Sequence, residues 1–208
     1  MATKAKHATD AKDAKDAKDA KDPKGADGTH RWIALLRGIN VGGHKPVKMV
    51  ALREAFESLG ATNVRTVVQS GNVVFDHPCA ERDAAVLRER LASGLAETFG
   101  FDIPVLLRSA RCFEAAVAAN PFQGEAAEPA HGHVWFLEAL ATKADRAGLD
   151  RLKAASERWH LEGDAFYLHA PEGVGRSKLA AGAERLLGVA ATARNLRTVD
   201  TLRGMLED

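Results

Sequence analysis

The chain has 208 residues, of which 46% are hydrophobic and 27% are charged, and its formal net charge is +1. This composition predicts a globular protein of one or two domains. No apolar run approaches the roughly 18 residues that a transmembrane helix needs, and the charged N-terminus lacks the apolar segment of a secretory signal. The two cysteines, Cys79 and Cys112, are too few for a disulfide framework or a cysteine-rich zinc site. We therefore expect a cytoplasmic protein that has no membrane partner.

The charges divide the chain near residue 30. Residues 1–30 carry seven lysines and six aspartates, and residues 11–22 repeat Ala-Lys-Asp four times. A three-residue period cannot keep one helical face, and the segment has almost no apolar side chain larger than that of alanine. We therefore predict that residues 1–30 are disordered. The rest of the chain carries 22 basic and 22 acidic residues, and this neutrality argues against a general nucleic-acid-binding protein.

The first part of the predicted folded region alternates strand and helix patterns. An entirely apolar run at 32–36 is typical of a central strand that is buried on both faces. The periodicity then predicts a helix, two strands, a helix, a strand and an extra helix at 49–59, 64–68, 73–75, 87–99, 104–107 and 113–120.

The same order of patterns recurs in the second part. The expected strands, helices and final extra helix lie at 134–137, within about 142–156, and at 159–161, 166–169, 179–187, 189–193 and 199–206. Thr198 is the expected N-cap of the final helix. The sequence thus predicts an α+β protein of two tandem ferredoxin-like (βαββαβ) halves, each followed by an extra helix, in one compact unit.

The boundaries follow from this duplication. We expect a first half at 31–120, a linker at 121–132 that is rich in Ala, Glu, Pro and Gly, and a second half at 133–208. Each half is near the small end of the range for a stable domain, so we expect the halves to pack against each other.

The first polar segment follows the strand at 32–36 and is rich in glycine. Its backbone amides can form an anion-binding concavity, to which Arg37, Asn40 and Lys48 add charge and hydrogen-bonding groups. The alternative is a long connection between a strand and a helix, with one arginine that reaches solvent.

The second polar segment is Gln69-Ser70-Gly71-Asn72. It is either a hairpin turn in which Ser70 and Asn72 bond their own backbone, or a recognition element, because a hairpin has no need of Gln69.

The third polar segment, residues 173–178, enters the helix expected at 179–187. Ser177 is either the N-cap of that helix or a donor to a bound phosphate. Arg176 and Lys178 oppose the helix dipole unless an anion joins them. The spacing is not that of a Walker A loop.

Arg194 and Asn195 stand between the last expected strand and the final helix. In the duplication they correspond to Arg108 and Ser109, so each half ends a strand with an arginine. Other candidates are weaker: His131 and His133 have no third ligand nearby, and Cys112 lies on the apolar side of a helix. The residues therefore predict no metal site and identify no cofactor.

Several sequence strings carry a resemblance to a known family. They are ALLRGINVGGHK at 34–45, VRT at 64–66, QSGNVVF at 69–75, ANPF at 119–122, YLHAPEGVGRSKL at 167–179 and TARNLRTV at 192–199. On these strings the chain resembles the bacterial family catalogued as domain of unknown function 1697, over residues 31–203. The resemblance implies two ferredoxin-like halves and no established activity, substrate or cofactor. The family usually has Trp where Leu196 stands, which weakens a stacking role at that position.

We predict that the protein binds a small anionic, phosphate-bearing ligand such as a nucleotide or a metabolite. The residues predicted to bind it are Arg37, Asn40, Lys48, Gln69, Ser70, Asn72, Ser177, Lys178, Arg194 and Asn195. Two alternatives remain open: a metal-independent enzyme of unknown reaction that uses the same polar residues, and a nucleic-acid or protein interaction module.

The ferredoxin-like order raises a difficulty for a single site. We expect the end of the first strand, near Arg37, and the turn at Gln69 to lie at opposite edges of the sheet. Either the loops reach over one face, or there are two sites, or one cluster is structural.

Overall fold

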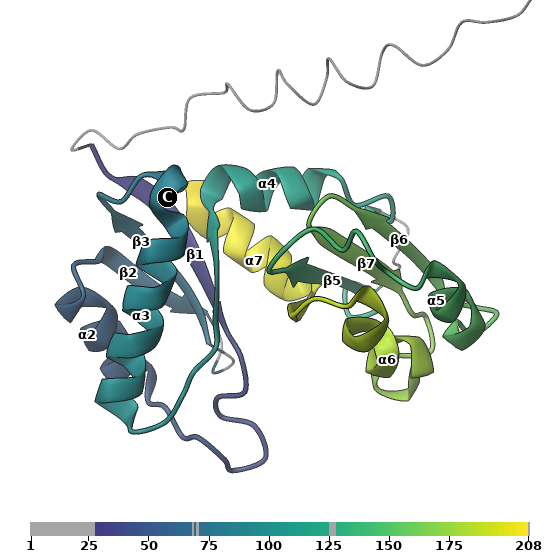
Figure 1. The fold of residues 1–208 in the computed structure, drawn as a ribbon, viewed down its shortest axis with the longest axis horizontal. Helices are drawn as coiled ribbons and strands as arrows, with labels where there is room; N and C mark the ends of the chain where they lie inside the picture. Colours follow the sequence, from purple (N-terminus) through teal and green to yellow (C-terminus); the bar gives the residue numbers. More distant parts are fainter. Residues whose placement is uncertain (1–27, 68, 70, 125–127, 208) are drawn as a thin grey trace, which may run out of the picture.

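The computed structural model describes residues 28–67, 69, 71–124 and 128–207 and contains two four-stranded sheets (Figure 1). All but the last three residues of the predicted disordered tail lie outside the described residues. Neighbouring strands are antiparallel in both sheets, in the orders β2-β3-β1-β4 and β6-β7-β5-β8. These two arrangements confirm the predicted pair of ferredoxin-like halves.

The elements of the two halves follow each other in the same order. The first half consists of β1 (His30–Leu36), α2 (Met49–Ser58), β2 (Thr62–Val67), β3 (Asn72–His77), the 3-10 turn η1 (Glu81–Asp83), α3 (Ala84–Phe99), β4 (Val105–Ser109) and the extra helix α4 (Ala110–Ala118). The second half consists of β5 (Gly132–Leu137), α5 (Arg146–Leu152), β6 (Arg158–Glu162), β7 (Ala165–His169), the 3-10 turn η2 (Val174–Arg176), α6 (Lys178–Leu187), β8 (Ala191–Asn195) and the extra helix α7 (Leu196–Glu207).

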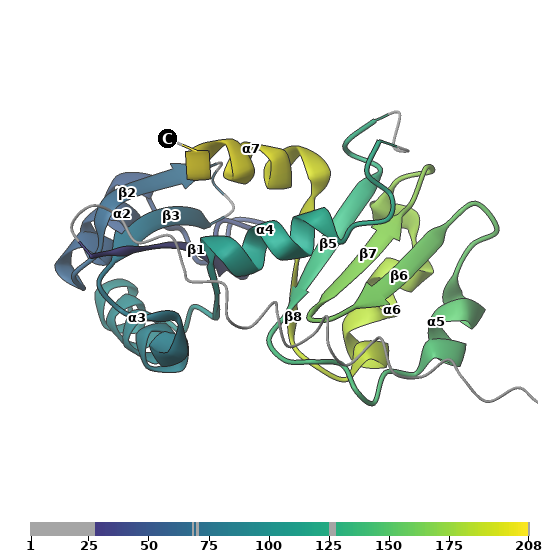
Figure 2. The same cartoon turned by 90° about the horizontal axis from the view of Figure 1, so that it is seen from above.

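The strand β1 alternates its side chains between two covered faces of the first sheet, which explains its unbroken apolar sequence. Trp32 and Leu36 face a core beneath α2 and α3. Ile33 and Leu35 face a second core that contains side chains of both sheets, α4 and α7. α4 and α7 thus lie in the middle of the molecule (Figure 2), whereas α5 and α6 cover the outer face of the second sheet.

The extra helices α4 and α7 each contact the half to which they do not belong. The buried hydroxyl of Tyr167, in β7, donates to the carbonyl of Ala116 in α4 at 2.6 Å. In the opposite direction, Arg31 and Arg65 of the first sheet donate to carbonyl groups in the last turn of α7 at 3.1 and 2.6 Å. Arginines at this end of a helix satisfy free carbonyls and complement the helix dipole.

Several element boundaries differ from the prediction by a few residues. β1 begins at His30, one residue before the expected folded region. α5 covers Arg146–Leu152, within the predicted range of about 142–156, and the Asp145 carboxylate caps its start by accepting the amide of Gly148 at 2.8 Å.

The end of the second half also differs from the prediction. β8 continues to Asn195, which pairs with His133 of β5. The prediction of Thr198 as N-cap is wrong, because α7 already begins at Leu196 and the Asn195 side chain accepts the Thr198 amide at 2.9 Å. Asn195 was not recognised as a cap because the strand was expected to end two residues earlier.

Two arginines join the halves in the same way. Arg194, in β8, donates through Nη2 to the carbonyl of Leu36, the last residue of β1, at 2.9 Å. Arg108, in β4, donates through Nη2 to the carbonyl of Leu137, the last residue of β5, and also pairs with Asp164 at 3.0 Å. Each half therefore ends its last strand with an arginine that binds the first strand of the other half, so the junction has approximate two-fold symmetry.

A second pair of contacts repeats this symmetry with the charges exchanged. Arg37 follows β1 and makes a two-pronged ion pair with Glu184 of α6, with both distances 2.6 Å. Glu138 follows β5 and pairs with Arg88 of α3 at 3.8 Å. The hydrogen bond to Glu184 raises the pKa of Arg37. The side chains of Arg37 and Glu184 are 48% and 39% exposed, so we expect this ion pair to contribute less than about 1 kcal/mol.

Tyr167→Phe tests the contact between α4 and the second sheet. The substitution keeps the ring in the core and removes one buried hydrogen bond, so we expect a loss of about 1 kcal/mol in the free energy of unfolding. Urea denaturation of the full chain measures this loss. The slope of the free energy of unfolding against urea concentration should stay unchanged. Unchanged stability would show that the hydroxyl makes no net contribution.

Arg194→Lys and Glu184→Gln test the two kinds of junction contact against each other. Arg194 uses Nε for Asn72 and Nη2 for the Leu36 carbonyl, and a lysine has a single nitrogen in place of these two. Each buried acceptor left without a donor costs about 1–3 kcal/mol. We expect Arg194→Lys to lower the free energy of unfolding by about 2–4 kcal/mol and Glu184→Gln to lower it by less than about 1 kcal/mol. Chemical denaturation gives both values, and the reverse order would show that the exposed Arg37–Glu184 ion pair stabilises the junction more than Arg194 does.

Candidate functional site

Three predicted ligand-binding residues, Arg37, Asn72 and Arg194, lie at the junction between the halves. Arg37 binds Glu184, and Arg194 donates to the Oδ1 atom of Asn72 as well as to β1. Asn72 is fully buried, and its side-chain amide donates to the carbonyl of Val67 at 3.0 Å. Burial lowers the pKa of Arg194 to about 10. All three side chains are thus engaged by the protein itself.

The expectation that the end of the first strand and the 69–72 turn lie at opposite sheet edges is wrong. β3 pairs antiparallel with β1, so the beginning of β3 lies beside the end of β1. Leu35 pairs with Asn72, and the amide of Leu36 donates to the carbonyl of Gly71 at 2.7 Å. The turn and the loop after β1 are therefore neighbours.

This proximity brings Asn40 and Gln69 together. The Asn40 amide donates to the carbonyls of Gln69 and Val47 at 2.9 and 3.0 Å, and its Oδ1 accepts the amide of Val47 at 2.8 Å. Lys48 is exposed and directly precedes α2. Ser70 lies outside the described residues. Asn40 thus holds the loop in place, while Lys48 and Gln69 line a shallow hollow beside it.

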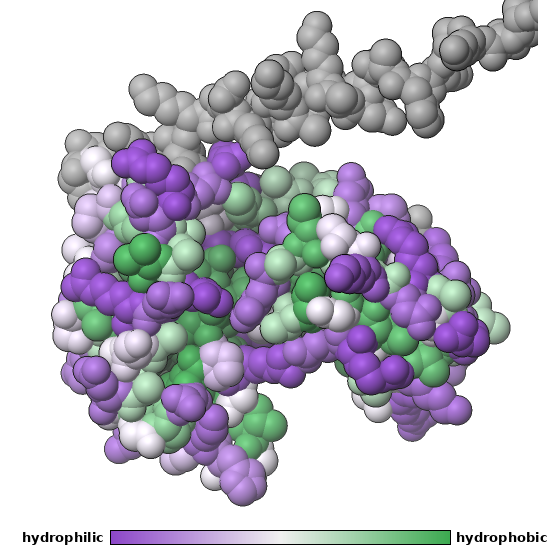
Figure 3. Space-filling view, in the orientation of Figure 1, coloured by the Kyte–Doolittle hydropathy of each residue, from purple (hydrophilic) through white to green (hydrophobic). Residues whose placement is uncertain are grey.

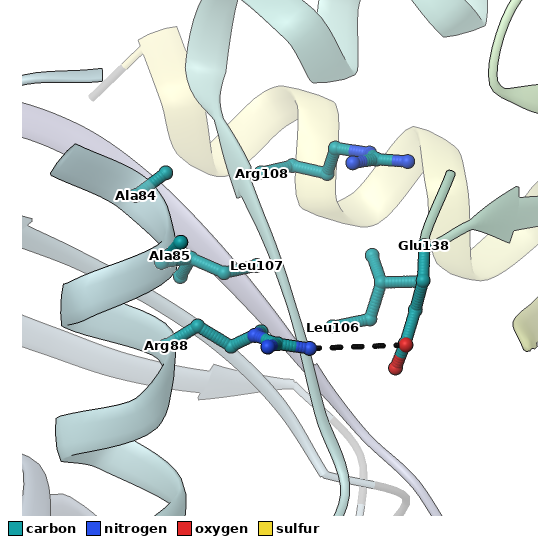
Figure 4. A pocket seen from close by; sticks show the side chains of 7 residues that line it. All are labelled: Ala84, Ala85, Arg88, Leu106, Leu107, Arg108 and Glu138. Carbon is teal, nitrogen blue, oxygen red and sulfur yellow. Dashed lines mark ion pairs between the residues drawn. The ribbon is translucent and has the colours of Figure 1, made fainter. Parts of the chain in front are cut away.

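A hollow of about 290 Å³ lies at the junction, between α3, β4 and the residue that follows β5 (Figure 4). Its polar side chains are those of Arg88, Arg108 and Glu138. Figure 3 shows that an indentation separates the two halves on one face of the molecule. Glu138 pairs with Arg88, and Asp164 pairs with Arg108, so the charges of this hollow are matched internally.

A different pocket, of about 350 Å³, lies at the N-terminal end of α6. Ser177 precedes this helix, and its hydroxyl oxygen accepts the amide of Ala180 at 2.9 Å. This contact confirms the N-cap interpretation of Ser177. Lys178 is the first residue of α6, and both residues line the pocket.

Four basic side chains surround this pocket: Arg151, Lys153, Arg176 and Lys178. Its two acidic residues accept hydrogen bonds from other groups. Glu157 accepts one from the amide of Ala154 at 2.9 Å, and Glu172 accepts one from the hydroxyl of Ser156 at 2.8 Å. The pocket therefore has an excess of two positive charges.

Most of this positive charge lacks a partner. Within the part of the chain that the structure describes, Lys153, Arg176 and Lys178 form no side-chain hydrogen bond and no ion pair, and Arg151 makes a 3.5 Å contact with Asp145. We call Arg151, Lys153, Arg176, Ser177 and Lys178 the α6 pocket.

Arg151 and Lys153 were missed as site residues because they reach the pocket only through the packing of α5 on α6. Two glycines allow this packing. A Cβ atom on Gly148 would lie 2.6 Å from the side chain of Leu186, and one on Gly182 would lie 2.6 Å from that of Leu152. Glycines inside two helical patterns are a sequence signal for such a close approach.

Other candidate chemistries gain no support from the described residues. The Cys112 thiol donates to Glu81 at 2.6 Å, and burial and this contact raise its pKa, which disfavours the reactive thiolate. Among residues 28–67, 69, 71–124 and 128–207, no group of three His, Cys, Asp or Glu residues could hold a metal ion. No described helix is long and apolar enough to span a membrane.

A solved structure shares this architecture. It is that of a conserved bacterial protein, SP0830 from Streptococcus pneumoniae, with 26% sequence identity and a TM-score of 0.64. The similarity covers 86% of this chain and 99% of the other chain. No protein with a curated description matches the chain.

The sequence profile of one protein family matches residues 29–167, which include all of the first half and the second half as far as β7. The family is described as "Protein of unknown function (DUF1697)". The match covers more than half of the chain and agrees with the strings that carry the resemblance, so the chain belongs to the DUF1697 family.

Proposed function

We propose that this protein binds a small phosphate-bearing anion in the α6 pocket. The observation that carries the proposal is the gathering of four basic side chains around one pocket, three of them without a partner in the described chain. Like charges that line one pocket repel each other, and a bound anion would reduce that repulsion.

The position of the pocket on α6 supports an anion over other ligands. The first amides of a helix have no acceptor within the helix, and Ser177 takes only that of Ala180. The helix dipole places partial positive charge at the same end. Because Arg176 and Lys178 oppose this dipole, their position is unfavourable in the absence of an anion and favourable in its presence.

The other described residues that were predicted to bind the ligand do not line the α6 pocket. Arg37, Asn72 and Arg194 hold the halves together, and Asn195 caps α7. Their role in ligand binding stays a prediction, as does that of Asn40, Lys48, Gln69 and Ser70. The α6 pocket uses Ser177 and Lys178 from the predicted set and adds three arginine or lysine side chains.

The proposal is tested by the thermal stability of the full chain in increasing phosphate, compared with chloride at equal ionic strength. A specific site gives a gain that follows RT ln(1 + [L]/Kd) and reaches about 2.7 kcal/mol at a concentration of 100 times Kd. Lys178→Ala should remove most of this gain and leave the stability in chloride equal or slightly higher, because it removes an unfavourable charge.

Lys143→Ala is the matched control, since Lys143 is exposed, has no partner in the described chain and does not line the pocket. It should keep the full phosphate gain. Equal losses in Lys143→Ala and Lys178→Ala would indicate a general charge effect. A Lys178→Ala variant that is unstable in chloride would show that Lys178 is structural, and either result would contradict the proposal.

A further inference from the structure

The loop between β1 and α2 presents apolar side chains to solvent. Val41 near its tip and Val50 in the first turn of α2 are 65% and 58% exposed. Val50 lines a hollow of about 440 Å³ together with Pro46 and Met49. The loop extends away from the rest of the first half (Figure 1). We call Val41, Pro46, Lys48, Met49, Val50 and Gln69 the loop surface.

Several backbone and side-chain contacts hold the loop in this exposed position. Gly42 and Gly43 both have positive φ angles, of 58° and 79°, at the tip of a small hairpin closed by Val41 and His44. The non-glycine residue Lys45 also has a positive φ of 48°, and its ammonium donates to the carbonyl of Asp102 at 2.7 Å. Such unfavourable backbone conformations persist only where other contacts hold them, and they cluster at functional sites.

The contacts of Asn40 fix the base of the same loop. Its φ is 55°, and its three hydrogen bonds, to both backbone groups of Val47 and to the carbonyl of Gln69, were described above. These hydrogen bonds, which are partly exposed, hold the loop in the position that leaves Val41 and Val50 in water. Ordered apolar side chains in water are a feature of interaction surfaces.

Two polar groups on the loop surface are available to a partner. The Lys48 ammonium and the Gln69 side-chain amide form no hydrogen bond or ion pair within the described chain. None of the described residues that line the hollow is acidic, so the formal charge that they supply is positive. None of them is aromatic either, which disfavours stacking on a nucleic-acid base.

We propose that the loop surface binds an extended peptide segment of another protein in which an acidic side chain stands beside an apolar one. The apolar side chain enters the hollow at Pro46, Met49 and Val50, and its acidic neighbour pairs with Lys48. The Gln69 amide has both a donor and an acceptor, so it matches the two hydrogen-bonding groups of a peptide backbone. Charge complementarity at Lys48 selects this partner over a basic peptide.

The test uses the full chain and two arrays of ten-residue peptides. One array combines Asp and Glu with Leu, Ile and Val, and the other replaces the acidic residues with Lys and Arg. We expect binding to the acidic array only. The best acidic peptide, labelled with fluorescein, then gives a Kd by fluorescence anisotropy for each variant.

Lys48→Glu should raise the Kd of this peptide by about tenfold or more and should allow binding to the basic array. The double substitution Val41→Ser and Val50→Ser should raise the Kd of the same peptide to a similar extent. Val86→Ser is the matched control, because Val86 is 69% exposed on α3, away from the loop; its Kd should be unchanged. Circular dichroism verifies that each variant is folded.

Other occupants give different results. Equal binding by the parent and Lys48→Glu, or no binding to either array, would overturn the proposal. A concentration-dependent dimer in sedimentation that Val41→Ser abolishes would also overturn it, because it would identify a second copy of the chain as the occupant. Binding to phosphatidylcholine vesicles would overturn it too, because it would identify a lipid surface.

Discussion

The burial of Arg194 and Arg108 at the junction determines how the two sheets meet. A buried guanidinium must keep its hydrogen-bond acceptors, because an unmatched charge away from water is strongly unfavourable. Each arginine finds a main-chain acceptor in the last residue of the other half's first strand, Leu36 or Leu137. Sliding one half along the other would break both contacts at once, so they favour the observed register. The shared apolar core and the helices α4 and α7 are arranged around that register.

The same junction explains why so many conspicuous polar residues are not at a ligand pocket. Arginine beside asparagine at the ends of strands is a pattern that binding sites and interfaces share, because both need fixed donors and acceptors. Here the partner of Arg37 is Glu184 and that of Arg194 is Asn72, both supplied by the protein. The α6 pocket differs in that its cations outnumber its carboxylates and those carboxylates already have donors. This difference in pairing, and not the abundance of polar residues, separates the two regions.

The fold was predictable from sequence because its elements have strong, local signals. The unbroken apolar run of β1 and the helical stripes follow from burial alone. The contact between Gln69 and Asn40 depends on which strands are neighbours in the sheet. The cap at Asn195 depends on the residue at which pairing between β8 and β5 stops. Neither is visible in a local pattern. Arg151 reaches the α6 pocket through glycine-mediated packing of two helices, a contact between distant segments that periodicity does not encode. Ser177 and Lys178 were found because a helix start has a sequence signature of its own.

The contact of α7 with the first sheet has a consequence for the order in which the protein can be completed during synthesis. The inner face of the first sheet, with Ile33, Leu35 and Val74, is covered in part by Val199 and Leu202 of α7. This helix follows every other described element in the chain and leaves the ribosome after them. The part of this face that α4 does not cover therefore stays exposed while the whole second half is being made. A chaperone that recognises apolar surface has its longest opportunity to bind here, and the arrival of α7 ends it.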